Sequence, residues 1–130
     1  MRRRSIEIPG FRHEHPIPAA SRIGPFVVSG GISGMDPVTG RLPDGIEEQC
    51  ALVFAHMKEI VEAASGTTDD ILKVTVWLKD GAHRKFVNQQ WLRMFPDAEA
   101  RPARHTFVGQ ELAGTMLIQC EFWAVLNGGT

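Results

Sequence analysis

Two charged residues in the last third of the chain stand where apolar strand residues would be expected. Arg104 lies in the stretch Arg101-Pro-Ala-Arg-His-Thr-Phe-Val108, in which the proline favours the start of a strand. Glu121 interrupts the apolar run from Thr115 to Leu126. A guanidinium binds a carboxylate or phosphate through two parallel hydrogen bonds, and a carboxylate within a strand needs a partner or a task. The pair indicates either a small site for an anionic substrate with an acid or base nearby, or a structural ion pair.

Other polar residues suggest further parts of such a site. Ser29 precedes Gly30-Gly31, where a ligand can approach the backbone closely because no Cβ is in the way. Asn88 could line a pocket. His13-Glu14-His15 could be a fragment of a metal site, but no third ligand with zinc spacing follows, so we predict no metal. The glycines lack the spacing of a phosphate-binding loop.

The composition bounds the class of protein. A chain of 130 residues forms one domain, and its formal net charge of −1 lacks the basic surface of a dedicated nucleic-acid binder. No apolar run is long enough to cross a bilayer, so we expect no membrane span. Cys50 and Cys120 fall on apolar faces and are predicted to be buried, reduced thiols, which favours a cytoplasmic location.

The hydrophobic periodicity predicts an ordered set of elements. After an extended N-terminal segment (residues 1–15), a strand is expected over 25–29 and a turn over 35–40. A helix follows over about 46–64, with Asp44 as its N-cap and Gly66 as its stop. The remaining elements are a strand over 71–78, a helix over about 82–95, and strands over about 104–109 and 115–126. This order predicts a single α+β or α/β domain over 1–130, with helices packed on a mixed sheet.

The last predicted strand is apolar on both faces. Met116, Ile118, Cys120, Phe122 and Ala124 alternate with Leu117, Glu121, Trp123 and Val125. Two helices can cover only one face of a small sheet, so the other face needs a different cover. We predict a homo-oligomer in which sheets meet; the alternative is that a long N-terminal loop covers that face.

Taken together, the motifs resemble the RidA (YjgF) family of enamine and imine deaminases. The resemblance extends from about Pro16 to Val125. Its pieces, in chain order, are Ser29-Gly30-Gly31, Asp36-Pro37-Val38-Thr39-Gly40, Gln49, Lys73 to Asp80, Val87-Asn88, Phe95-Pro96, and Pro102-Ala103-Arg104 with Glu121.

The resemblance implies a chorismate-mutase-like α+β fold, a mixed β-sheet with two helices packed on one face. It also implies a homotrimer with pockets between adjacent subunits, and no cofactor. Arg104 would clamp the carboxylate of a small substrate, and Glu121 would orient the attacking water. The substrate would be a reactive enamine or imine such as 2-aminoacrylate, converted to a 2-oxo acid and ammonia. The pocket wall would include Gly31 and Thr106, with Ser29 and Asn88 as further substrate-binding residues.

The chain departs from the family pattern at the pocket. Many members have a tyrosine near the N-terminus, whereas this chain has no tyrosine, and Gly31 stands where many have glutamine. The substrate preference is therefore open. Two other functions stay open as alternatives: a non-catalytic sensor of small carboxylates, and a ribonuclease or translation inhibitor.

Overall fold

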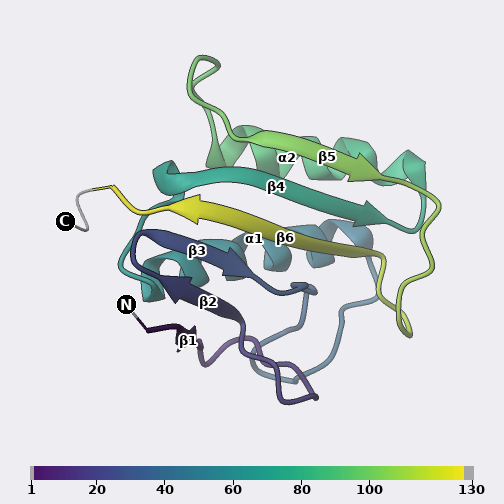
Figure 1. Cartoon of the computed structure of the whole chain (residues 1–130). Coiled ribbons are helices and arrows are strands. Elements are labelled where there is room, and N and C mark those ends of the chain that lie inside the picture. The colour runs from purple at the N-terminus through teal and green to yellow at the C-terminus, as the bar shows by residue number, and fades with distance from the viewer. Residues whose placement is uncertain (1, 128–130) are drawn as a thin grey trace.

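A computed structural model, which describes residues 2–127, shows one six-stranded sheet with two helices on one of its faces (Figure 1). The strands lie in the order β1-β2-β3-β6-β4-β5. Their bounds are β1 Arg4–Ile6, β2 Ala20–Ile23, β3 Phe26–Ser29, β4 Ile71–Leu78, β5 Ala103–Phe107 and β6 Ile118–Val125. The two helices are α1, Ile46–Ala63, and α2, Arg84–Met94.

The sheet is mixed because of the strands around its centre. β4 pairs antiparallel with β6 and parallel with β5, whereas β3 pairs antiparallel with β6. The predicted fold class, an α+β domain with a mixed sheet and two helices on one face, is therefore confirmed. No helix among residues 2–127 combines the length and the apolar character needed to cross a membrane.

The core fills the space between the sheet and α1. Along β6, every second residue from Ile118 to Ala124 is buried, and each faces the helices. Both cysteines belong to this core, as predicted: each is free and fully buried, and burial raises the pKa of Cys50 to about 12. Such thiols remain protonated and unreactive at neutral pH.

Several element boundaries differ from the predictions. The N-cap of α1 is Gly45 and not Asp44, and no side chain caps the helix. The left-handed residue that follows α1 is Ser65, one position before Gly66. β6 begins at Ile118 rather than at 115, because 109–117 form a loop beside α1. Two short strands, β1 and β2, extend the sheet within the N-terminal stretch.

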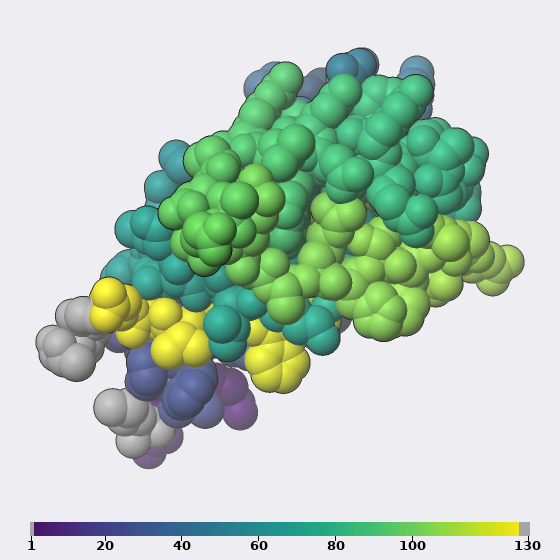
Figure 2. Space-filling model, turned by 90° about the horizontal axis from the view of Figure 1, so that it is seen from above, coloured from purple at the N-terminus to yellow at the C-terminus, as the bar shows by residue number. Residues whose placement is uncertain are grey.

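The face of the sheet opposite the helices, which we call the open face, carries an exposed apolar patch. Phe26, Val28, Trp123 and Val125 share this face and are 38–61% exposed. Side chains of β6 (yellow) and β3 (blue) reach the surface on the side away from the helices (Figure 2). The N-terminal loop instead packs Phe11 against His56 of α1, so the alternative, that this loop covers the exposed patch, is wrong.

Candidate functional site

Arg104 is held at the edge of the sheet by three neighbours. Its Nε donates to Oγ1 of Thr106 at 3.0 Å, and its Nη2 donates to Oδ1 of Asn88 at 2.8 Å. Its guanidinium lies 5.0 Å from the ring centre of Trp91 on α2, which is cation–π geometry. Thr106 follows Arg104 by two residues on β5 and therefore shares its face.

None of these three neighbours neutralises the guanidinium. Asn88, Thr106 and Trp91 orient the cation but carry no charge, and no ion pair joins Arg104 to an acidic residue within 2–127. Burial lowers the pKa of Arg104 from its ordinary value. An oriented, partly desolvated guanidinium without an acidic partner is suited to bind an external carboxylate.

Glu121 lies on the other face of the sheet. Arg104 is opposite Val74 on β4, and Val74 is opposite Phe122 on β6; both are buried beneath the helices. Glu121 is opposite Thr75, one residue further along β4. Because neighbouring strand residues point to opposite faces, Arg104 and Glu121 do not meet within one chain. A structural Arg104–Glu121 ion pair within the chain is therefore ruled out.

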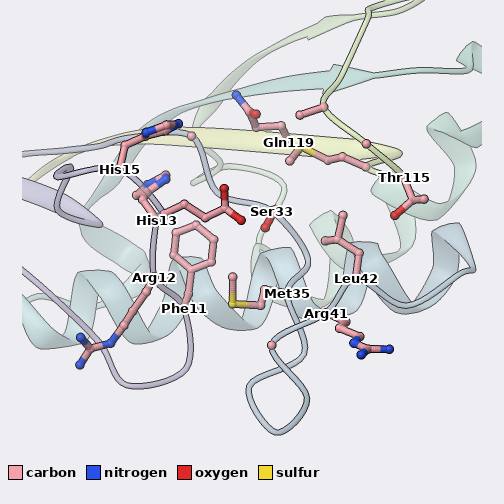
Figure 3. A pocket seen from close by; sticks show the side chains of 16 residues that line it. Phe11, Arg12, His13, His15, Ser33, Met35, Arg41, Leu42, Thr115 and Gln119 are labelled. Atoms are coloured by element: carbon pink, nitrogen blue, oxygen red, sulfur yellow. The ribbon is translucent and has the colours of Figure 1, made fainter.

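A cavity of about 730 Å³ is lined in part by Gly31 but not by Arg104. Figure 3 shows it from close by. Its walls come from the N-terminal loop, the loop that follows β3, the loop before β6, and the start of β6. The lining residues are Phe11, Arg12, His13, Glu14, His15, Gly31, Ser33, Met35, Gly40, Arg41, Leu42, Ala113, Gly114, Thr115, Met116 and Gln119.

Gly31 leaves room for a neighbouring side chain in this wall. A Cβ at Gly31 would lie 2.6 Å from Nε2 of Gln119. The absence of a side chain therefore allows the Gln119 amide to pack over the backbone at the cavity wall.

The predicted site residues thus fall into separate groups. Asn88 and Thr106 surround Arg104, whereas Gly31 lines the cavity. Ser29 is buried and lines neither: its Oγ accepts from the N–H of Phe122 at 2.9 Å and joins β3 to β6.

The sequence interpretation missed two polar residues of the cavity. Gln119 precedes Glu121 by two residues on the same face of β6, and period-two alternation could have identified it. His13 was considered only as a metal ligand. Its Nε2 is buried and has no hydrogen-bond partner among residues 2–127, and burial lowers its pKa. In the described part of the chain, no cluster of three or more His, Cys, Asp or Glu residues could hold a metal ion.

Three comparisons place this architecture among known proteins. A model of the family described as endoribonuclease L-PSP matches residues 13–126. The chain is similar to a 2-iminobutanoate/2-iminopropanoate deaminase of Salmonella typhimurium, with 32% identity over 104 residues that cover 79% of this chain and 81% of the relative.

Two solved structures share the fold along nearly their whole length. A candidate endoribonuclease of Thermotoga maritima superimposes with a TM-score of 0.88 at 31% identity, covering 96% of this chain and 98% of that one. The YjgF gene product of E. coli superimposes with a TM-score of 0.85 at 27% identity, covering 94% and 98%.

Proposed function

This chain belongs to the endoribonuclease L-PSP family, to which the YjgF and RidA proteins belong, and we propose on that premise that it is a hydrolytic deaminase of 2-imino acids and their enamine tautomers. The observation that carries the proposal is the oriented Arg104 guanidinium, which has no acidic partner among the described residues. The similarity to a named imine deaminase gives the reaction class. No cofactor takes part in this proposal, because an imine is already activated for attack by water.

The proposed reaction is a hydrolysis in two steps. Arg104 binds the carboxylate of the substrate and so fixes the adjacent imine carbon. Water adds to this carbon, forming a C–O bond while the C=N π electron pair moves to nitrogen, and one proton of the water passes to that nitrogen. The C–N bond then breaks, a proton passes from the hydroxyl group to the departing nitrogen, and the products are a 2-oxo acid and ammonia.

We place the complete site between subunits. Arg104 is on one face of the sheet, while Gly31, Gln119 and the cavity lie across β4 and β6 from it. The exposed apolar open face supports an assembly in which the two groups come from neighbouring chains. The assembly proposed from the family resemblance is a homotrimer. Glu121 would orient water in the same assembly, since its carboxylate lies on the open face two residues from Gln119.

The test of the reaction uses imines made in situ. An amino-acid oxidase with catalase generates 2-imino acids, and semicarbazide traps whatever imine remains. Addition of the protein should lower the yield of semicarbazone, and Arg104→Ala should abolish this effect. The matched control is Arg101→Ala, because the nearby Arg101 donates to the backbone carbonyl of Phe95 and has no role in the proposal.

The intersubunit arrangement has its own test. Arg104→Ala and Gly31→Trp each disable one half of the proposed site, so each homo-oligomer should be inactive. In a mixed assembly, about a quarter of the interfaces would combine an intact Arg104 with an intact cavity. Co-expressed variants should therefore regain up to about a quarter of the wild-type turnover. A mixture without activity, formed from variants that demonstrably co-assemble, would contradict the shared site.

The same assays separate the two alternative functions. Tight binding of 2-oxo acids without imine turnover would indicate a carboxylate sensor. RNA cleavage that survives purification and disappears in Arg104→Ala would indicate a ribonuclease, although the net charge of −1 argues against an RNA-binding surface.

A further inference from the structure

We infer that the cavity beside Gly31 receives the side chain of the substrate and that the protein prefers 2-imino acids with bulky, uncharged, apolar side chains. This inference rests on the proposed function, because it names the substrate class of that reaction. It is carried by the size of the cavity, by the apolar residues of its walls and by the outward direction of its two arginines.

The cavity is far larger than a small imino acid needs. The side chain of 2-iminopropanoate is one methyl group, whereas the cavity encloses about 730 Å³. Pockets of this size usually bury ligands much larger than a methyl group. A small substrate would leave most of the apolar wall in contact with water.

The wall is mostly apolar and is held in place from behind. Phe11, Met35, Leu42 and Met116 come from three separate loops and line the cavity together. Figure 3 labels the first three of them. Phe11 is 2% exposed, and its ring packs against His56, which in turn hydrogen-bonds to the carbonyl of Met35 at 2.7 Å. Phe11 and Met35 are therefore fixed by the same residue of α1, so that this part of the wall is preformed.

The two arginines that line the cavity turn away from it. The guanidinium groups of Arg12 and Arg41 point outward (Figure 3). The one acidic residue of the lining is Glu14. An acidic substrate side chain would lose water, gain no guanidinium partner inside and lie near this carboxylate, so imines of acidic amino acids are disfavoured.

The expected preference follows from the burial of apolar groups. Each additional buried methylene is worth about fourfold in binding. A substrate side chain with three more carbons should therefore be favoured by roughly 50-fold in kcat/KM, an upper value that assumes complete burial.

The test compares imino acids of different size on the intact protein. Imines are generated from leucine, methionine and phenylalanine, and from alanine and 2-aminobutyrate, and kcat/KM is measured for each with semicarbazide as trap. We expect at least about a tenfold preference for the large side chains. Equal or higher values for alanine-derived imine would overturn the inference but leave the deaminase intact. An absence of turnover with every imine would overturn both.

A cavity-filling variant links the preference to this cavity. Ala113 lines the cavity from an exposed turn, so Ala113→Phe should narrow the space with little effect on folding. The ratio of kcat/KM for leucine-derived over alanine-derived imine should fall by about tenfold or more. Ala98→Phe is the matched control, because Ala98 is exposed in the loop before β5 and does not line the cavity. An unchanged ratio in a folded Ala113→Phe protein would contradict the assignment of the cavity.

Discussion

Replacement of Arg104 by lysine separates a substrate clamp from a structural cation. Lysine keeps the positive charge but replaces the planar fork with a single ammonium group. The second hydrogen bond to a bound carboxylate is then lost, at about 1.5–3 kcal/mol. The value of kcat/KM for imine hydrolysis should therefore fall about 10- to 150-fold. In the same variant, the loss of the neutral contacts to Thr106 and Asn88 should lower the free energy of unfolding by only about 1–2 kcal/mol.

The assay measures both quantities on the same preparations. Imine turnover is followed by semicarbazide trapping, and the free energy of unfolding by urea denaturation at several protein concentrations. Arg101→Lys is the control, because Arg101 also lies beside β5 but donates to a backbone carbonyl. The reasoning would be refuted by an Arg104→Lys protein with wild-type kcat/KM. A loss of activity that merely follows a loss of folded protein would refute it equally.

Three further predictions concern assembly, pH and packing. Trp123→Arg places a charge on the open face and should yield smaller assemblies in sedimentation, whereas Leu92→Arg, on an exposed position of α2, should not. Burial lowers the pKa of His13 below 6.5, so the unfolded chain binds this proton more readily. The free energy of unfolding should be highest above pH 6.5 and decline as the pH falls through the folded-state pKa, and His13→Gln should reduce this decline in urea titrations. Gln49 is fully buried and bonds to three backbone groups, so Gln49→Leu should cost about 2–4 kcal/mol in the same measurement; a smaller loss would mean that water replaces the amide.

The sequence predicted the local features of the fold well, because they follow from short-range periodicity. The alternation along 118–125 correctly separated the buried residues of β6 from the exposed ones. The strand over 71–78 has the predicted bounds for the same reason. The predicted N-cap of α1, Asp44, was wrong because Gly45 adopts the extended backbone that an N-cap requires.

The arrangement of the site could not be predicted, because it depends on pairing between distant strands. The order β6-β4-β5 places Val74 between Arg104 and Phe122, and this order decides which face each charged residue shares. The cavity likewise joins loops that are separated by up to about a hundred residues in the chain. From the sequence, only the two-residue alternation of β6 indicates that Gln119 shares a face with Glu121.

The polar groups of the proposed site are divided between the two faces of the sheet. Burial of the open face in an assembly could therefore also complete the site. An apolar face could be buried by a two-fold dimer, in which the same patch meets itself and both halves of a site repeat within one interface. A cyclic assembly joins different patches, so each interface would combine one Arg104 with one cavity. Arg104 is on β5, at one edge of the sheet, and Gly31 follows β3 on the other side of β6. We therefore propose a head-to-tail cyclic assembly, such as the homotrimer proposed above, as the form in which the site is complete.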